Sequence, residues 1–474
     1  MNRVDHLIDP GSFEAVHDGL ESRDPLGYPA YRNALRRARD KAGADESVVY
    51  GAARVDGARC IVAAFRFGFM GGSMGEVAGE RIARAMEEAR ARELPFVLWT
   101  ETGGARMQEG MRSLIQMPKV VSSRVSLRHA HLPFIAVLGN PTTGGVLASI
   151  AALADITFAV RGATVGFAGP RVAQSVTGRA LSPGSHTAAN TAARGLVDAV
   201  VDERDVRDQV GRILELLRPD EPAHVEAPRL TERSDEDPWA AVQAVRDTAR
   251  PRAPDLIAAA SDEIFLLRGD RAGGVDDAVV TALARVGGRR CVLIGLDHRH
   301  LPGPAAYRTA RRALDVAESL NLPVGTLIDT RGADPGEESE AGGIAWEIAR
   351  TYEAFLTASV PVLAIVIGEG GSGGALAFGA ADRLVAYRDS IFSVIAPEGA
   401  AEILWRDAGR AEEAARLLRV TASDLARLGV CDDIVDEPLE AGSLRRVLTY
   451  HLDRLARGEN HAEERRSRWR HREP

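Results

Sequence analysis

One short pattern occurs twice in the 474-residue chain and constrains its fold more than any other feature. An apolar run of strand type leads into a Gly-rich turn, and small residues suited to the start of a buried helix follow. The two copies span residues 132–148 and 360–377. A strand that feeds a Gly-rich turn at a helix N-terminus presents backbone N–H groups to an anion. Two copies therefore suggest chemistry on two oxyanions.

The two copies belong to a longer repeat with nearly constant spacing. The anchor pairs are Leu94-Pro95 with Leu322-Pro323 and Leu132-Pro133 with Val360-Pro361, each 228 positions apart (323 − 95 and 361 − 133), and Phe167–Pro170 with Val394–Pro397, 227 positions apart (394 − 167). A proline can open a strand for local reasons, so the constant spacing is the informative part. Short strands alternate with helices between the anchors, which predicts an α/β fold in two tandem domains.

Composition predicts where the two domains meet. Six prolines and several charge runs fall close together around residues 218–254, which is typical of a linker. We expect a first domain at residues 1–217, a linker at 218–253 and a second domain at 254–474. The Arg-rich tail from residue 457 is expected to be a solvated helix end or disordered.

Charge, hydrophobicity and cysteine content exclude several classes of protein. The net charge of −8 argues against nucleic acid as the main partner. No apolar stretch reaches the roughly 18 residues of a membrane span, and the N-terminal segment lacks a signal-peptide core, so we expect a cytoplasmic protein without membrane contact. Cys60, Cys291 and Cys431 form no CxxC pair. His298 and His300 lack a third ligand at metal spacing, so we expect a surface loop and no metal site.

The second Gly-rich turn also admits a dinucleotide-binding interpretation. Gly368, Gly370 and Gly373 follow the GxGxxG spacing, and Asp389 lies about 20 residues further on. The unit would span only about 25 residues where about 30 is usual, and the first copy carries Asn140-Pro141 at the corresponding place. These departures favour oxyanion binding over dinucleotide binding.

Glycine pairs and charged residues near the turns have ordinary structural explanations as well. A single Gly-Gly pair is explained by close helix packing, but such pairs follow apolar runs at five places, namely 71–72, 103–104, 144–145, 370–371 and 373–374. Several donor loops of this kind favour binding of a thioester or another oxyanion. Ion pairs that order loops explain Arg106, Glu109 and Arg171. Glu101 and Glu369 are candidate bases, although a polar position at a helix N-terminus explains both equally well.

Seven segments carry a family resemblance. Residues 69–75, 103–110, 140–146 and 166–172 resemble the β subunit of the bacterial acetyl-CoA carboxylase carboxyltransferase, and residues 328–336, 366–377 and 393–399 resemble its α subunit. The resemblance covers nearly the whole chain. It implies a natural β–α fusion made of two tandem crotonase-like (ββα superhelix) domains, with the acyl-CoA side in the first and the carboxybiotin side in the second.

The family's reaction fits the expectation of two oxyanions. Carboxybiotin, carried by a separate biotin carboxyl carrier protein and loaded by a separate biotin carboxylase, gives up CO₂, and the biotin nitrogen takes a proton from the acyl-CoA. The resulting thioester enolate attacks CO₂, so acetyl-CoA becomes malonyl-CoA. Removing one preorganised donor to such an oxyanion typically costs about 10²–10³-fold in rate. No side-chain base is required.

The resemblance also implies site residues. Gly103 and Gly104 are expected to hold the CoA thioester oxygen, and Gly373 and Gly374 the biotin ureido oxygen. The residues expected to contact CoA or biotin are Gly72, Ser73, Gly75, Ala105, Arg106, Gly144, Gly145, Gly371 and Ala375. On this interpretation Gly144-Gly145 is structural or lines the pocket, and the chemistry of the first half lies one strand earlier.

Departures from the family pattern keep other functions open. The family's four-cysteine zinc ribbon cannot be built from three cysteines, Arg331 and Asp334 replace Pro and Tyr of the α motif, and residues 295–303 replace a His-Gln-Lys-Gly segment. Alternatives are a malonyl-thioester decarboxylase, a biotin-independent relative on the same fold, or a non-catalytic scaffold in a carboxylase complex. The family also implies a homodimer or a higher homo-oligomer.

Overall fold

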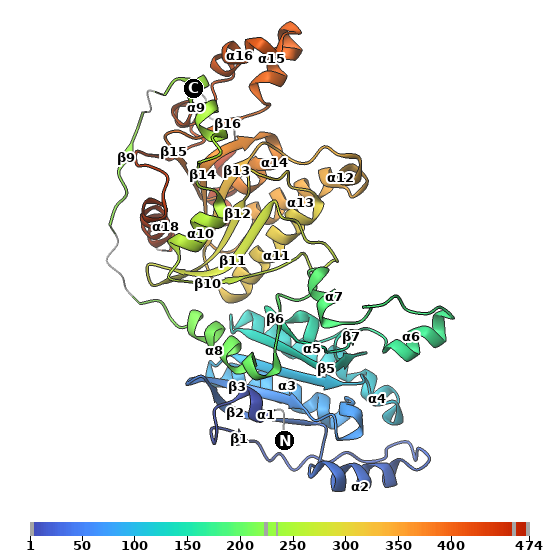
Figure 1. The fold of residues 1–474 in the computed structure, drawn as a ribbon. Helices are drawn as coiled ribbons and strands as arrows, with labels where there is room; N and C mark the ends of the chain where they lie inside the picture. The colour runs from blue at the N-terminus through green and yellow to red at the C-terminus, as the bar shows by residue number, and fades with distance from the viewer. Residues whose placement is uncertain (1–3, 222–225, 234–235, 457–460, 471–474) are drawn as a thin grey trace. The chain divides into compact units, whose positions relative to one another are not determined.

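The computed structural model describes residues 4–221, 226–233, 236–456 and 461–470. The chain divides into two compact units, Met1–Arg218 and Pro219–Pro474, each with its own sheet flanked by helices (Figure 1). Both sheets are largely parallel, with antiparallel strands at an edge. This confirms the predicted α/β class. The exact bounds predicted for two domains and a linker stay a prediction.

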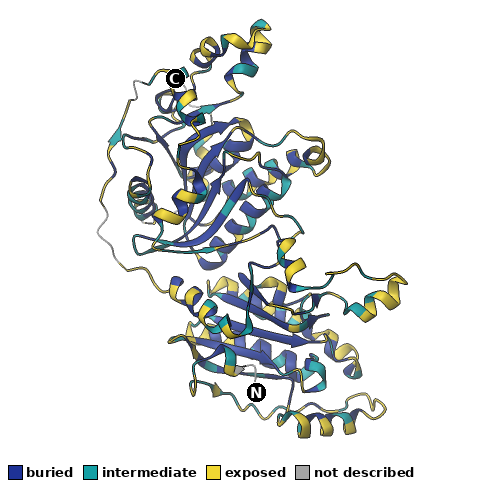
Figure 2. Ribbon diagram, in the orientation of Figure 1, coloured by how far each residue is buried: buried dark blue, intermediate teal, exposed yellow. Residues whose placement is uncertain are grey.

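The first unit contains an eight-stranded sheet in the order β1-β2-β3-β4-β5-β6-β8, with β7 paired to β5. Its strands are β1 Glu14–Ala15, β2 Val48–Val55, β3 Ala58–Phe65, β4 Phe96–Thr102, β5 Phe134–Thr143, β6 Ile156–Val160, β7 Val165–Gly166 and β8 Ala199–Val201. The strands β4 and β6 are buried along their whole length (Figure 2). Near-continuous apolar runs of this kind are expected of parallel strands covered on both faces.

The helices of the first unit flank this sheet. They are α1 Val4–Leu7, α2 Tyr31–Ala42, α3 Glu76–Arg92, α4 Met111–Leu114, α5 Gln116–His129, α6 Pro170–Thr177, α7 Ala188–Ala193 and α8 Val206–Leu216, with the 3₁₀ helices η1 Met70–Gly72, η2 Met107–Glu109, η3 Ala151–Leu153 and η4 Glu203–Asp205. Helices α3 and α5 pack against each other. Gly79 of α3 permits this contact, because a Cβ there would lie 2.5 Å from Cβ of Gln116.

The second unit contains a nine-stranded sheet in the order β10-β11-β12-β13-β14-β15-β17-β9, with β16 paired to β14. Its strands are β9 Leu230–Thr231, β10 Glu263–Leu266, β11 Val279–Val286, β12 Arg289–Leu296, β13 Val324–Thr330, β14 Val362–Gly371, β15 Arg383–Tyr387, β16 Ile391–Ser393 and β17 Asp433–Val435. Apolar side chains of the central strands pack against α10 and α18 in one cluster.

The helices of the second unit include one within the predicted linker, α9, and one in the Arg-rich tail, α19. They are α9 Pro238–Arg246, α10 Ala253–Ala260, α11 Pro304–Leu320, α12 Glu337–Ala341, α13 Ile344–Thr357, α14 Ser372–Leu376, α15 Pro397–Trp405, α16 Ala411–Leu418, α17 Ala422–Arg427, α18 Ala441–Leu455 and α19 His461–Arg468, with the 3₁₀ helices η5 Ala377–Gly379 and η6 Ala408–Arg410. Strand β9 and helix α9 lie within the predicted linker, and both contact the second unit, at β17 and at β14 and α16 respectively.

The C-terminal helix α19 is anchored, so the expectation of a solvated tail is wrong for Arg465. This side chain is fully buried. It pairs with Asp382 at 2.8 Å and donates to the backbone oxygen of Val360 at 2.9 Å. Since a buried guanidinium needs acceptors for its donors, the carbonyls at the end of α13 and the Asp382 carboxylate hold α19 in place.

The strand register proves the repeat at the level of backbone pairing. Phe96 pairs with Phe134 in the first unit, and Val324 pairs with Val362 in the second. The separation is 228 positions in both strands (324 − 96 and 362 − 134). The irregularity between Thr100 and Thr102 recurs between Ile328 and Thr330. Equivalent strands therefore end at equivalent places, and the turns that follow them can be compared residue by residue.

A buried histidine in α18 predicts a loss of stability in acid. His451 is fully buried, and its ring nitrogens donate to and accept from no group among the described residues. Burial lowers its pKa from 6.5 to about 4. Between these values the unfolded chain binds a proton that the folded chain does not, so stability falls as pH falls from about 6.5 to 4, by up to about 3 kcal/mol.

We predict that the stability of the His451→Phe variant depends less on pH than that of the wild type. The measurement is the denaturation midpoint of the second unit between pH 7 and pH 4.5. His300→Asn is the matched control, because His300 is exposed. An unchanged slope in the His451→Phe variant would contradict the prediction.

Candidate active site

The turn after β5 in the first unit carries backbone donors without acceptors. The amide of Gly144 donates to the carbonyl oxygen of Phe167 at 2.8 Å, and Ala148 donates to Gly144 at 3.1 Å. Within the part of the chain that the structure describes, the amides of Gly145 and Val146 have no hydrogen-bond acceptor. The sequence predicts that Gly144-Gly145 is structural or lines the pocket. The structure shows that this turn also offers two adjacent N–H groups.

The corresponding turn of the second unit begins α14. Its N-cap, Gly371, supplies no side-chain hydrogen bond, and the first N–H groups of a helix have no partner inside the helix. Ser372, Gly373 and Gly374 therefore present their amides. With the 228-residue separation, Gly373 and Gly374 correspond to Gly145 and Val146, so the same two peptide positions are available in both units. Ala375 is the next residue of α14 and is fully buried.

The amides of Gly103 and Gly104, predicted to hold the thioester oxygen, are already bonded inside the protein. Gly103 donates to the carbonyl oxygen of Gly71 at 3.0 Å, and Gly104 donates to Oγ1 of Thr102 at 2.9 Å. Binding a thioester oxygen there would require breaking one of these bonds. Ala105, predicted as a contact residue, is half-buried, and its amide has no acceptor among the described residues.

These hydrogen bonds of Gly103 and Gly104 shape the turn after β4, and this turn supports the turn after β5. Gly104 has φ +109°, and a Cβ built on Gly144 would lie 2.7 Å from Cα of Gly104. The second unit has a comparable contact one position earlier, at Gly371 rather than at Ser372, the equivalent of Gly144. Gly332 has φ +135°, and a Cβ on Gly371 would lie 2.1 Å from the carbonyl of Arg331. In each unit one backbone turn lies directly against another, and glycine is required there because any side chain would separate them.

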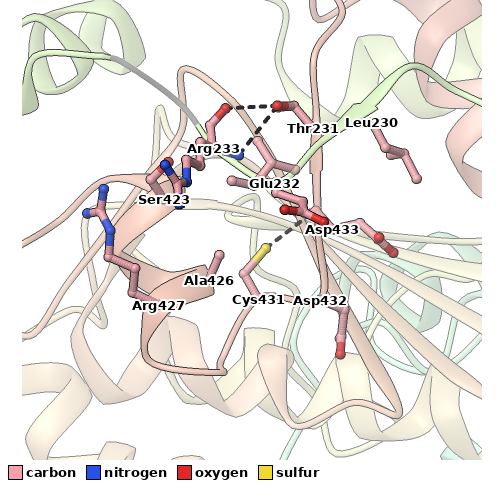
Figure 3. Close-up of a pocket in the computed structure, with 11 residues that line it drawn as sticks. Leu230, Thr231, Glu232, Arg233, Ser423, Ala426, Arg427, Cys431, Asp432 and Asp433 are labelled. Atoms are coloured by element: carbon pink, nitrogen blue, oxygen red, sulfur yellow. Dashed lines mark hydrogen bonds between the residues drawn. The ribbon is translucent and has the colours of Figure 1, made fainter.

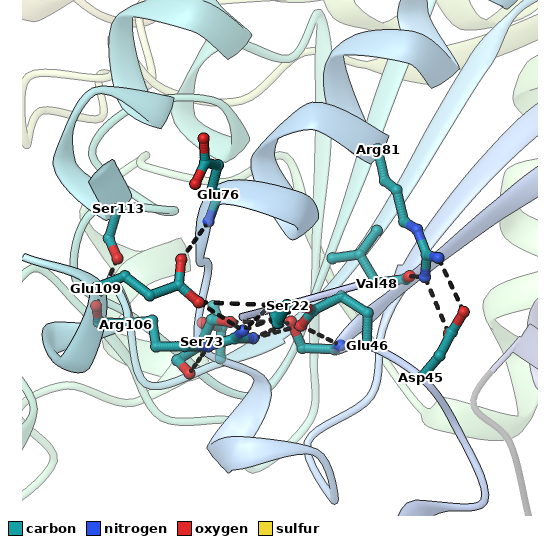
Figure 4. Close-up of polar contacts among 12 residues, drawn as sticks. Ser22, Asp45, Glu46, Val48, Ser73, Glu76, Arg81, Arg106, Glu109 and Ser113 are labelled. Carbon is teal, nitrogen blue, oxygen red and sulfur yellow. Dashed lines mark hydrogen bonds and ion pairs between the residues drawn. The ribbon is translucent and has the colours of Figure 1, made fainter. Parts of the chain in front are cut away.

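Arg106 is the centre of a buried polar network (Figure 4). Its side chain has no exposed surface and forms ion pairs with Glu46 and Glu109. It also donates to Oγ of Ser22 at 2.8 Å and to the carbonyl oxygen of Ser73 at 2.8 Å. Burial alone would raise the pKa of Glu46, but the charge and hydrogen bonds of Arg106 hold that pKa below its ordinary value. This confirms the explanation that ion pairs of Arg106 and Glu109 order a loop, and a contact of Arg106 with a cofactor stays a prediction.

Glu109 fills the position where the sequence suggested an approach of CoA to Gly72, Ser73 and Gly75. One of its carboxylate oxygens accepts the amide of Glu76 at 2.6 Å, at the N-terminus of α3. A Cβ on Gly75 would lie 2.6 Å from both oxygens. Gly72 and Ser73 donate their amides to Phe69 and Met70 within η1. An internal carboxylate thus occupies the helix N-terminus that an external anion would otherwise use.

A second polar cluster lies at the end of β13 and β14. Asp329 accepts hydrogen bonds from Arg252 at 3.0 Å and from the amide of Glu369 at 3.0 Å. It also lies 3.1 Å from Nδ1 of His298, which is largely buried, so the expectation of a surface loop is wrong for this residue. Burial raises the pKa of Glu369, whose Oε2 has no hydrogen-bond partner among the described residues and lies 3.8 Å from Nε of Arg246. The cluster joins the two strands just before the donor turn.

The dinucleotide interpretation fails on two features. The helix after the glycine pattern, α14, contains only five residues. Asp389, the candidate ribose ligand, is paired with Arg250 at 2.5 Å and also accepts from its Nη2 at 3.1 Å. Both the helix length and the acidic residue are therefore unsuited to a bound dinucleotide.

One cavity lies away from the donor turns. A cavity of about 680 Å³ beside β9 and β17 is lined by residues including Thr231, Arg233, Arg427 and Cys431 (Figure 3). No residue predicted from the sequence as part of the site lines it. Among the described residues we find no group of three or more His, Cys, Asp or Glu side chains able to hold a metal ion, and no helix there has the length and hydrophobicity to cross a bilayer.

Comparison with known proteins identifies the family. Residues 229–455 match a family model described as acetyl co-enzyme A carboxylase carboxyltransferase-like. The acetyl-coenzyme A carboxylase carboxyl transferase subunits beta/alpha of Salinispora arenicola is 41% identical over 93% of this chain and 82% of the relative. The chain belongs to the carboxyltransferase family of biotin-dependent acyl-CoA carboxylases. This confirms the resemblance inferred from the sequence.

Other members of the family are similar over most of their length. A probable biotin-dependent acyl-coenzyme A carboxylase beta3 subunit of Mycobacterium bovis is 36% identical over 92% of this chain and 90% of the relative. The transcarboxylase 12S structure, with methylmalonyl-coenzyme A bound, has a TM-score of 0.78 and 26% identity and covers 97% of this chain and 90% of its own. The structural neighbours are carboxyltransferases of the crotonase-like fold, which confirms the predicted fold class. The protein is thus a carboxyltransferase with two such folds in tandem.

Sequence reasoning missed three contributors to the donor turns. Val146 carries no chemical signature, because only its backbone matters. Ser149 and Tyr352 bond the carbonyl oxygens of the two turns, at Gly145 and Gly373 respectively. The 228-residue spacing could have matched Val146 to Gly374 in advance, but Tyr352 comes from another helix and gave no local signal.

The Arg106 network predicts a large stability effect from one substitution. Arg106→Met leaves Glu46 and Glu109 buried without their cation, which typically costs about 3–5 kcal/mol. We expect the first transition in chemical denaturation, followed by circular dichroism, to shift to lower denaturant.

Arg161→Met is the control in the same unit, because Arg161 and Asp202 form an exposed pair at 2.8 Å. Exposed pairs contribute about 0–1 kcal/mol. Equal shifts of the denaturation midpoint in Arg106→Met and Arg161→Met would show that the Arg106 network does not stabilise the first unit.

Proposed function

We propose that the protein transfers a carboxyl group from carboxybiotin to a short acyl-CoA, with acetyl-CoA as the principal acceptor and malonyl-CoA as the product. The single observation that carries this proposal is the pair of equivalent turns, each with two adjacent unbonded amides at the end of a buried parallel strand. The choice of acetyl-CoA is supported by the name of the Salinispora relative. The transcarboxylase 12S neighbour has methylmalonyl-CoA bound, so that acyl group is the competing candidate.

The first unit is proposed to hold the thioester oxygen on Gly145 and Val146. This revises the pair expected from the sequence, and the support is that Gly103 and Gly104 already donate inside the protein. Amides without an internal acceptor can donate to an oxyanion without breaking a hydrogen bond inside the protein. Preorganised donors stabilise charge that develops in the transition state. Ala105 adds a neighbouring amide to the same region.

The second unit is proposed to hold the ureido oxygen of biotin on Gly373 and Gly374. Its free amides fit an oxygen that gains negative charge, because both belong to the first turn of α14 and no side chain caps them. When bound, carboxybiotin supplies CO₂ and a nitrogen that accepts the proton from the acyl group. The protein's residues bind and orient both carbonyl oxygens, and this function requires no side-chain base.

The proposed partners follow from the family. A biotin carboxyl carrier protein and a biotin carboxylase, as separate chains, would deliver and reload the carboxyl group. The name of the Mycobacterium relative, a beta3 subunit of a biotin-dependent carboxylase, supports a division of the reaction among subunits.

We further propose that a second copy of the chain covers an apolar helix in each unit. Phe167 and Val176 beside and within α6 are 74% and 80% exposed, and Val394 and Ile403 beside and within α15 are 72% and 74% exposed. The two pairs are separated by the same 227 positions. The transcarboxylase 12S neighbour is described as a hexamer assembly, which supports a homo-oligomer.

The proposed reaction is tested in reverse, with malonyl-CoA and free biotin. We expect acetyl-CoA to form, as measured by liquid chromatography, and its formation to depend on biotin. Methylmalonyl-CoA is tested in parallel as the competing substrate. If it turns over more slowly than malonyl-CoA, the result would support acetyl-CoA as the acceptor. Turnover without biotin would instead favour the thioester decarboxylase, and no turnover of either substrate would contradict the proposal.

The proposed homo-oligomer is tested with Val176→Glu and Ile403→Glu. A charge placed in an apolar interface is strongly unfavourable, so each variant is expected to reduce the mass measured by light scattering after gel filtration. Trp346→Glu is the control, because Trp346 is 69% exposed but lies on α13. A wild-type monomer, or variants with unchanged mass, would contradict this proposal.

A further inference from the structure

A side-chain hydroxyl bonds the same backbone carbonyl in both donor turns. In the first unit, Oγ of Ser149 donates to the carbonyl oxygen of Gly145 at 2.6 Å. In the second unit, the hydroxyl of Tyr352 donates to the carbonyl oxygen of Gly373 at 2.8 Å. Gly145 and Gly373 are 228 positions apart (373 − 145), which is the separation of the paired strands. The two carbonyls are therefore structurally equivalent.

The residues that supply these hydroxyls are not equivalent. The position 228 residues after Ser149 is Ala377, and the position 228 residues before Tyr352 is Arg124. Ala377 has no hydroxyl, and Arg124 donates to the carbonyl oxygen of Leu153 and to Asp155. Ser149 reaches back four residues within its own turn, whereas Tyr352 reaches across from α13. The amide of Ala377 also donates to the Gly373 carbonyl oxygen, so Tyr352 supplies a second donor there. A side-chain hydroxyl thus reaches the equivalent carbonyl in both units by two different arrangements.

The bonded carbonyl shares a peptide group with a proposed donor. A trans peptide is planar, so its C=O and N–H point in opposite directions. Fixing the carbonyl of Gly145 therefore fixes the direction of the Val146 N–H, and fixing the carbonyl of Gly373 fixes that of Gly374. A hydrogen bond to the oxygen also polarises the peptide and strengthens its N–H as a donor.

We propose that Ser149 and Tyr352 are positioning residues, each of which orients and polarises the peptide that donates to one of the two oxyanions. This inference rests on the proposed function. Neither hydroxyl is assigned a contact with a reacting atom.

The surroundings of Tyr352 fit this role. A Cβ built on Gly373 would lie 3.6 Å from the Tyr352 hydroxyl oxygen, so the phenol lies in contact with the turn. Burial raises the pKa of Tyr352, which keeps its hydroxyl protonated as a donor. On the next residue, a Cβ on Gly374 would lie 2.6 Å from the hydroxyl oxygen of Tyr307. The two tyrosines therefore contact consecutive glycines of the turn.

The test compares Tyr352→Phe and Ser149→Ala in the biotin-dependent decarboxylation of malonyl-CoA. A neutral hydrogen bond contributes about 1 kcal/mol, which corresponds to about fivefold in rate. We expect kcat to fall about fivefold or more in each variant while KM for biotin and for malonyl-CoA changes less than twofold, because the bond matters most when charge develops on the bound oxygen. The double variant is expected to lose more than either single variant.

The control variants remove similar hydroxyls away from the donor turns. Tyr387→Phe removes a bond of 3.0 Å to Ser443 in the second unit, and Ser126→Ala removes an i to i−4 bond to the carbonyl of Ser122 in the first. Both are expected to keep kcat within twofold of wild type. Equal losses in a variant and its control would show a general effect of packing and would overturn the inference.

A second measurement separates this inference from the proposed function. Hydrogen exchange of the peptides that contain residues 145–149 and 372–376 is expected to rise in Ser149→Ala and Tyr352→Phe respectively. If wild type shows no biotin-dependent turnover, the proposed function fails and the catalytic part of the inference fails with it, while exchange still tests whether the hydroxyls order the turns. If wild type is active and both variants match it, the inference alone is overturned.

Discussion

Close contact between two backbone turns is the constraint on which the rest of each unit depends. The turn after β4 lies against the turn after β5, and the turn after β13 lies against the turn after β14. A Cβ at Gly144 or Gly371 would fall within 2.7 Å or 2.1 Å of backbone atoms in the facing turn. Because adjacent parallel strands end at the same edge of a sheet, these turns meet there and leave their amides at that edge. The glycines are required for this contact before they are required for any chemistry.

This constraint gives the two turns of each pair different duties. The supporting turn uses its own amides to keep its shape, as the bonds of Gly103 and Gly104 show. The second turn, held in place by the first, keeps Gly145 and Val146 or Gly373 and Gly374 available. In the first unit the buried Arg106 network holds the supporting turn in place by joining the segment near Glu46 to η2. The network therefore acts on the site through backbone geometry.

Much of the fold could be predicted from the sequence because the repeat is encoded locally. Constant spacing of the Leu-Pro and Val-Pro anchors indicated the tandem arrangement, and apolar runs indicated the central strands. The burial of Arg465 was not predicted, because a run of arginines is usually solvated, and nothing local indicates that Arg465 meets Asp382 and the end of α13.

The sequence indicates the Gly-rich turns but not which of their amides are free, for a physical reason. Glycine pairs identify turns that can carry free amides, but the sequence does not show which amides find acceptors inside the protein. Gly103 and Gly104 have the pattern of donors, yet Gly71 and Thr102 accept from them in the folded chain. An ion pair of Arg106 with the nearby Glu109 was expected, but its partners Glu46 and Ser22 lie 60 and 84 positions earlier in the chain. Long-range polar pairing of this kind leaves no periodic pattern.

The most direct test of this account is a crystal structure of the protein with an acyl-CoA thioester analogue bound. The account predicts that the thioester oxygen accepts hydrogen bonds from the amides of Gly145 and Val146 at about 2.7–3.2 Å, with the bonds of Gly103 and Gly104 intact. A thioester oxygen bound instead to the amides of Gly103 and Gly104, with their internal bonds broken, would contradict it.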